Sequence, residues 1–120
     1  MKVLQILCVS FMLFATSTHA AEFIDGLDDI PLMPQTTQLH SNNITFGNDE
    51  SRFSEAYISS EKNKFKNIAD FYKKTLPQLG WKFVSNKENA LHFERDMEVL
   101  DIVLEKSKPL LVRVTLKSKD

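Results

Sequence analysis

The sequence predicts a two-layer α+β domain, in which one main helix packs on a mostly antiparallel sheet of about five strands, in the order β-β-α-β-β-β. Apolar residues recur every three or four positions between residues 65 and 79, which is the period of a helix with one buried face. Runs on both sides of that segment alternate apolar and polar residues, as half-buried strands do. One apolar helix stripe and one apolar sheet face can bury each other, so this is the most economical packing.

Ahead of the domain, the first twenty residues have the pattern of a secretory signal peptide. Met1 and Lys2 give a positive start, an almost wholly apolar run continues to Ala15, and small or polar residues lead to Ala20. We expect cleavage between Ala20 and Ala21. An uncleaved anchor is disfavoured, because the apolar core is shorter than the roughly 20 residues that span a bilayer. The protein is therefore expected to be periplasmic or secreted, with no membrane span after signal removal.

The expected division of the chain is a signal peptide at residues 1–20, an extended acidic arm at 21–42 and a single small α+β domain at 43–120. The only cysteine, Cys8, lies in the signal peptide. Its removal leaves no thiol for a disulfide, a thiolate metal site or a cysteine nucleophile. The stability of the remaining chain must then come from packing.

The arm has two prolines, one glycine and no sustained period, which indicates an extended segment. Residues 21–55 carry seven acids and one base, whereas residues 56–120 carry thirteen bases and nine acids. We interpret both as solvated charge that keeps the protein soluble, so no nucleic-acid partner is expected. The arm residues expected to contact a protein partner are Phe23, Asp28, Asp29, Ile30 and Pro31.

An alternative for the arm is structural. In it, Phe23, Ile30 and Leu32 cover an exposed edge or end of the sheet, and the arm belongs to the core.

The domain is expected to begin with a hairpin, because two β-rich runs within residues 43–59 flank the turn-forming stretch 47–50. The helix follows, with Ser60 or Asn63 able to cap its start. Its apolar stripe is predicted from spacings of three and four residues. The stripe comprises Phe65, Ile68, Ala69, Tyr72, Leu76 and Leu79.

The helix is expected to end within the stretch FYKKTLPQLGWKF, residues 71–83. Pro77 lacks an amide hydrogen, which loosens the last turn, and Gly80 can take the left-handed conformation that ends it. Trp81 and Phe83 would then point the same way along the next strand, against the helix. We interpret the stretch as a structural joint. The alternative is a site for a small apolar ligand between helix and sheet, formed by Tyr72, Trp81 and Phe83.

The last third of the chain is predicted to form strands. Around a short turn at residues 107–109, a hairpin can place the apolar residues of its two strands face to face without adjustment. The expected pairs are Leu104 with Val112, Ile102 with Val114 and Leu100 with Leu116. In the preceding strand, Leu91 and Phe93 are expected to face inward.

The outward residues of that preceding strand are His92, Glu94 and Asp96, which are metal-ligand types. Alternate residues on a strand stand about 7 Å apart, too far for all three to reach one ion, so no metal is expected. The chain has no Gly-x-Ser-x-Gly elbow, no phosphate-binding loop and no His-Glu-x-x-His helix, and it has only three glycines. We therefore expect neither an enzyme nor a bound cofactor.

Three stretches resemble a known group of proteins: GLDDIPLMP after the signal peptide, FYKKTLPQLGW in the middle and FERDMEVLDIVL near the end. The chain is similar in these to small secreted proteins of proteobacteria, chiefly alphaproteobacteria, whose function is uncharacterised. The resemblance implies an envelope location and a small α+β domain, and it implies no activity. A glycine commonly follows the second proline in that group, where this chain has Gln35.

Two functions are compatible with these features. The first is a non-catalytic periplasmic interaction or binding module whose partner is an unknown envelope protein or lipid. The second is a carrier or sensor of a small apolar ligand held between helix and sheet.

Overall fold

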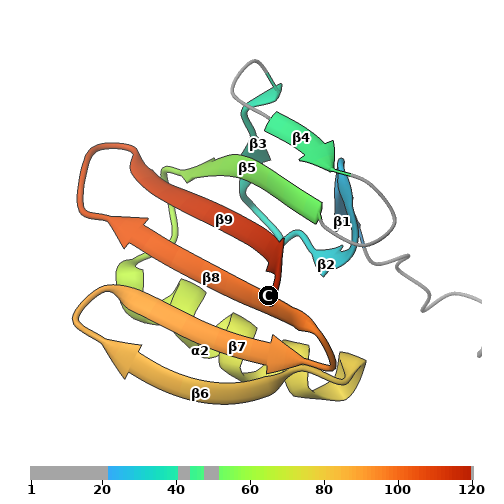
Figure 1. Cartoon of the computed structure of the whole chain (residues 1–120). Coiled ribbons are helices and arrows are strands. Elements are labelled where there is room, and N and C mark those ends of the chain that lie inside the picture. The colour runs from blue at the N-terminus through green and yellow to red at the C-terminus, as the bar shows by residue number, and fades with distance from the viewer. Residues whose placement is uncertain (1–21, 41–43, 48–51, 120) are drawn as a thin grey trace, which may run out of the picture.

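The structure, a computed structural model, describes residues 22–40, 44–47 and 52–119 (Figure 1). The expected signal peptide and its cleavage site lie outside these residues. A two-stranded sheet is formed by β1 (Phe23–Ile24) and β2 (Leu27–Pro31). The α-helix α2 (Phe65–Thr75) continues as the 3-10 helix η4 (Leu76–Leu79). The larger sheet has seven strands: β3 (Thr37–Gln38), β4 (Ile44–Gly47), β5 (Arg52–Ser60), β6 (Lys82–Lys87), β7 (Ala90–Arg95), β8 (Glu98–Glu105) and β9 (Leu110–Ser118).

The larger sheet has the strand order β3-β5-β9-β8-β7-β6, and β4 also pairs with β5. Every pairing among the described strands is antiparallel. The α+β class with one helix and a mostly antiparallel sheet is therefore confirmed. The predicted number of about five strands is wrong, because β3 arises from the arm and the chain after the helix forms four strands instead of three.

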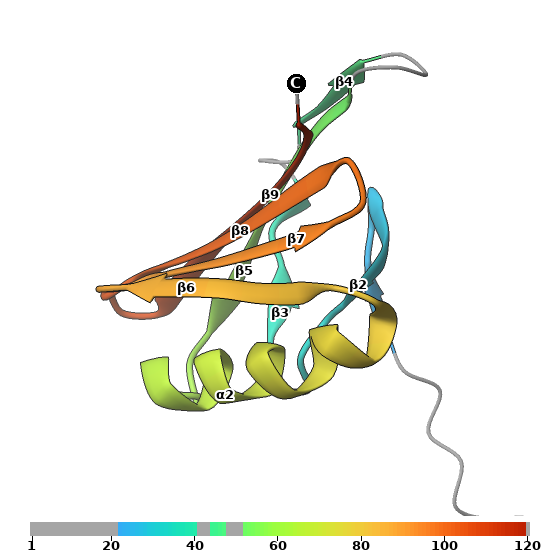
Figure 2. The ribbon, with the colours of Figure 1, turned by 60° about the horizontal axis from the view of Figure 1, so that its bottom comes forward.

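The helix lies along one face of the sheet (Figure 2). Ile68, Ala69, Tyr72 and Leu76 of the predicted stripe are buried, and Phe65 is half-buried against them. Leu79, at the end of the stripe, is instead 37% exposed. The helix begins after Lys64, so the predicted capping residues lie before it. Ser60 accepts a hydrogen bond from the backbone of Asn63 (3.0 Å) and thereby holds the loop ahead of the helix.

The joint after the helix forms as predicted. The α-helix gives way to η4 where Pro77 interrupts the amide pattern, and Gly80 ends it with a left-handed φ of 93°. A side chain at residue 80 would also stand 3.3 Å from Cδ of Arg95, so this position is both conformationally and sterically suited to glycine. Trp81 follows and is buried.

Both predicted hairpins are present. In the last one, Leu100 lies opposite Leu116, Ile102 opposite Val114 and Leu104 opposite Val112, in the predicted register. These six residues are buried on the face that the helix covers. The first hairpin pairs β4 with β5, and the loop between these strands lies outside the described residues.

The arm is packed against the domain over residues 22–40. Ile24, Leu27 and Ile30 belong to the main hydrophobic core, and the hydroxyl of Tyr72 donates to the carbonyl of Pro31 (2.8 Å). The Gln38 side chain is also buried, and its amide bonds both the N–H and the carbonyl of Asp25 (2.8 and 3.0 Å). The described part of the arm folds back on itself in the β1–β2 hairpin and contributes to the core, as the structural alternative predicts for Ile30, whereas Phe23 is exposed.

Gln35 lies in the turn of the arm with a φ of 68°. This left-handed region costs a residue with a Cβ about 1–2 kcal/mol relative to its preferred conformations. Glycine would adopt the same turn without that cost.

Candidate functional site

Most of the arm residues that we expected to contact a partner are already engaged within the molecule. Ile30 and Pro31 are buried, and the carboxylate of Asp29 forms an ion pair with Arg95. Phe23 is exposed by 41%, and Asp28 lies in β2. Because a buried side chain cannot touch a partner without unfolding the arm, the predicted contact surface is wrong for Ile30 and Pro31.

Two of the three aromatic residues of the alternative ligand site are side chains of the packed core. Tyr72 and Trp81 are almost fully buried and belong to the packed core, and burial raises the pKa of Tyr72. Phe83 is 38% exposed at the edge of the sheet, where its ring lies 5.4 Å from that of Phe93. The structural interpretation of the joint is therefore favoured, and an apolar ligand between these three rings would have to displace core side chains.

The outward trio of β7 does not converge on a point. Nδ1 of His92 lies 2.6 Å from Asp101, its Nε2 lies 3.1 Å from Glu94, and Asp96 stands in the following turn. No group of three or more His, Cys, Asp or Glu side chains suited to a metal ion occurs in the part of the chain that the structure describes. Because both ring nitrogens face carboxylates, the hydrogen bond to Asp101 above all raises the pKa of His92, against the effect of burial.

This histidine is also poorly placed for acid–base catalysis. Two carboxylates facing two ring nitrogens are best satisfied by the doubly protonated ring, in which both nitrogens donate. A general base needs a free nitrogen within hydrogen-bond reach of a substrate proton. With both positions occupied, His92 stabilises the sheet surface.

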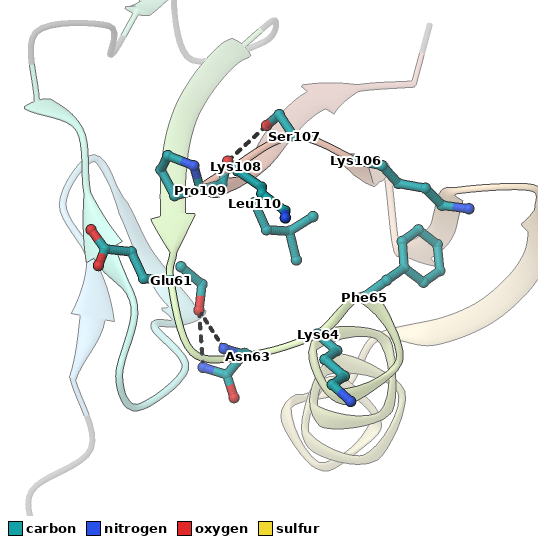
Figure 3. Close-up of a pocket in the computed structure, with 10 residues that line it drawn as sticks. Glu61, Asn63, Lys64, Phe65, Lys106, Ser107, Lys108, Pro109 and Leu110 are labelled. Atoms are coloured by element: carbon teal, nitrogen blue, oxygen red, sulfur yellow. Dashed lines mark hydrogen bonds between the residues drawn. The ribbon is translucent and has the colours of Figure 1, made fainter.

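A hollow lies at one end of the sheet, beside the start of the helix (Figure 3). Its volume is about 660 Å³, within the range of roughly 300–1,000 Å³ typical of small-molecule sites. We call it the lysine cleft. It is lined by Ser60, Glu61, Asn63, Lys64, Phe65, Lys106, Ser107, Lys108, Pro109 and Leu110.

Residues 60–65 and residues 106–110 meet at the lysine cleft because β5 pairs with β9. Strand β5 runs antiparallel to β9, with Ser60 opposite Leu110, so the end of β5 lies beside the beginning of β9. The chain leaves β5 and enters the helix at Phe65, while the turn that joins β8 to β9 supplies residues 106–109. Two connections far apart in sequence thus form opposite walls of one hollow.

The walls combine apolar surface with positive charge. Leu110 projects toward the centre of the hollow and the ring of Phe65 stands at its side (Figure 3). Nζ of Lys106 lies 5.3 Å from the centre of that ring, a cation–π distance. Three lysines line the cleft, against the single acid Glu61. Its interior therefore suits a ligand with an apolar part and an anionic group.

The lysines of the cleft are not neutralised by neighbours. Among the described side chains, neither Lys64, Lys106 nor Lys108 forms an ion pair. The first turn of α2 contains no acidic residue either. A helix start carries a partial positive charge, which acidic side chains in its first turn would offset. Because α2 has none there, this partial charge is left in place beside the cleft.

Sequence reasoning missed this site, although two of its signals were visible. They are the excess of bases after residue 55, which we interpret as solvated charge, and the stretch Ser107 to Pro109, which predicts only a turn. The missing step was the pairing of β5 with β9. Strands separated by so many residues leave no mark of their pairing in local periodicity.

Comparisons with protein-family models, with curated proteins and with solved structures found no match for this chain. Among the described residues, no helix is both long enough and apolar enough to cross a membrane. The function is therefore argued from the geometry of the molecule itself.

Proposed function

We propose that the protein is a non-catalytic, exported binding protein that holds a small amphiphilic anion in the lysine cleft. Its ligand has one carboxylate, phosphate or sulfate group and a short apolar chain or ring. The observation that carries this proposal is that Lys64, Lys106 and Lys108 line a hollow that is also lined by Phe65 and Leu110.

The two parts of such a ligand would meet different parts of the cleft. Lysine ammonium groups bind anionic oxygens as compact point charges, without requiring one fixed planar geometry. The Phe65 ring and the Leu110 side chain give the apolar part a surface away from water, worth about 25 cal/mol for each Å² that is buried. The alternative from the sequence was a small apolar ligand held by Tyr72, Trp81 and Phe83. The ligand proposed here also has an apolar part, but it binds in the lysine cleft.

An exported location fits this ligand class. The expected signal peptide would bring the protein to a compartment bounded by membranes, where fatty acids and lipid fragments are amphiphilic anions. The lysines and the apolar wall of the cleft supply contacts for binding, and we propose binding without chemical conversion.

Calorimetry with octyl phosphate below its micelle concentration tests the proposal. Inorganic phosphate provides the charge without the chain, and octyltrimethylammonium provides the chain with the opposite charge. We expect octyl phosphate to bind more tightly than either by tenfold or more, because only it satisfies both the lysines and the apolar wall. Equal binding of all three probes would refute a specific site.

Variants assign the binding to the cleft. Replacing Lys106 and Lys108 by glutamine should weaken octyl phosphate binding about tenfold, if each exposed charge contact contributes up to about 1 kcal/mol. The matched control replaces Lys82 and Lys117 by glutamine, which removes the same charge outside the cleft. If the control weakens binding as much as the cleft variant, the lysine cleft is not the site.

A further inference from the structure

Strand β6 is an open edge of the larger sheet. It ends the strand order and pairs only with β7 among the described strands. An edge strand presents unpaired backbone N–H and C=O groups, which can pair with an added strand. Every residue of β6 except Ser85 is exposed.

Apolar side chains gather at this edge. Within the described chain, five large hydrophobic residues are exposed, and three of them lie in the short stretch from residue 79 to residue 84. They are Leu79, Phe83 and Val84, with exposures of 37, 38 and 46%. The helix η4, which holds Leu79, contacts β6. The edge therefore offers apolar contacts beside its free backbone groups.

Lysines lie at the same edge. Lys82 and Lys87 stand at the two ends of β6, and Lys73 of the helix places Nζ 5.6 Å from the centre of the Phe83 ring. Lys74 follows in the last turn of the helix. None of these four lysines forms an ion pair with an acid that the structure describes.

The charges decide between two kinds of occupant. If two copies of β6 paired antiparallel and in register, Lys82 of one copy would face Lys87 of the other at both ends. Like charges directly opposite each other destabilise a strand pair. Lysines on an edge thus oppose pairing with a second copy, whereas an acidic strand would find complementary charge at both ends.

From these observations we propose that β6 binds an extended acidic segment of another protein, which adds to the sheet as a further antiparallel or parallel strand. Its backbone would pair with β6, its apolar side chains would cover Phe83 and Val84, and its carboxylates would meet the surrounding lysines. A bulge between Phe83 and Ser85 interrupts the register of β6. The added strand therefore pairs over a short length on each side of the bulge, which suits reversible binding.

Fluorescence anisotropy with three labelled peptides tests this proposal. The first alternates glutamate and valine, the second alternates lysine and valine, and the third has the first sequence with alternate backbone amides N-methylated. We expect the first to bind and the other two to bind at least about tenfold more weakly. The second has the wrong charge, and the third keeps the charge and side chains but cannot form the ladder of hydrogen bonds.

Protein variants locate the binding. K82E/K87E should weaken binding of the first peptide about tenfold or more, and its control K62E/K117E, with the same change in net charge, should weaken it by less than half as much. Amide hydrogen exchange should show β6 protected by the peptide. Equal binding of the N-methylated peptide, equal effects of the two variants, or a stable dimer that protects β6 would each overturn the proposal. Both variants leave the lining of the lysine cleft unchanged, so a difference between them reports on β6 and not on the cleft.

Discussion

Trp81 supports the side chain of Arg95, which contacts the helix end and the arm. It follows the helix end, it is 2% exposed, and the guanidinium carbon of Arg95 lies 4.2 Å from the centre of its ring. Arg95 also donates to the carbonyl of Leu79 (3.2 Å) and pairs with Asp29 of the arm. The ring therefore supports the arginine that links the helix end, the sheet and the arm.

We expect Trp81→Ala to reduce the free energy of unfolding by about 3–5 kcal/mol, since it removes a large buried side chain. Trp81→Phe should cost much less. The buried indole nitrogen has no hydrogen-bond partner in the described structure, so the phenyl ring removes an unsatisfied donor while keeping an aromatic face under Arg95. Urea unfolding followed by circular dichroism measures both. An alanine variant as stable as the parent would contradict the core assignment.

His92 makes stability depend on pH through its two carboxylate neighbours. Its pKa is raised in the folded protein, so the folded state binds the proton more tightly than the unfolded state does. The resulting stabilisation is complete below the unfolded pKa of about 6.5 and is lost as the pH rises through the folded pKa. We expect the urea midpoint to fall as the pH increases through this window.

His92→Gln should flatten that part of the pH profile. Asp101→Asn should flatten most of it as well, because the hydrogen bond to Asp101 is the largest cause of the raised pKa. The double variant should add little to either change if both act through one interaction. An unchanged slope in both single variants would show that another group titrates there.

At the scale of elements, the arm behaves as part of the folded unit. The hairpin of β1 and β2 gives the core Ile24, Leu27 and Ile30, and β2 contacts η4. Strand β3 extends the sheet by pairing with β5 at Ser59 and Ile58. Ile24, Leu27 and Ile30 of the arm are therefore satisfied by contacts within the molecule.

We expect Ile30→Ala to cost about 2–5 kcal/mol, because Ile30 is fully buried. The matched control is Phe23→Ala in the same hairpin, which should cost clearly less than Ile30→Ala since Phe23 is 41% exposed. Thermal melting compares the two. If the two variants melt alike, the arm does not contribute to the core.

At the scale of the whole molecule, the remaining expectation is export. The small-residue pattern ends at Ala20, and the apolar core before it is short for a permanent anchor. We expect the protein recovered from the cell envelope to have the intact mass of residues 21–120. A mass that retains the first twenty residues, or one increased by a lipid, would contradict cleavage and with it the exported location on which the proposed ligand class draws.

The sequence by itself determined the elements whose residues are neighbours along the chain. The helix stripe as far as Leu76, the stop at Gly80 and the register that pairs Ile102 with Val114 were predicted and are present, whereas Leu79 is exposed. Each depends on a period or a turn within one short segment, where backbone geometry and the need to bury apolar side chains leave few alternatives. The inward positions of Leu91 and Phe93 follow from the same alternation.

Only the tertiary structure decided how distant segments meet. The pairing of β5 with β9 brings Phe65 and Lys106 to one cleft, and the packing of the arm buries Ile30 instead of offering it to a partner. Neither follows from periodicity, because an apolar residue is equally satisfied by any apolar surface that excludes water. Which surface it finds is settled by the packing of the whole chain, and the positions of the lysine cleft and of the open edge at β6 are consequences of that choice.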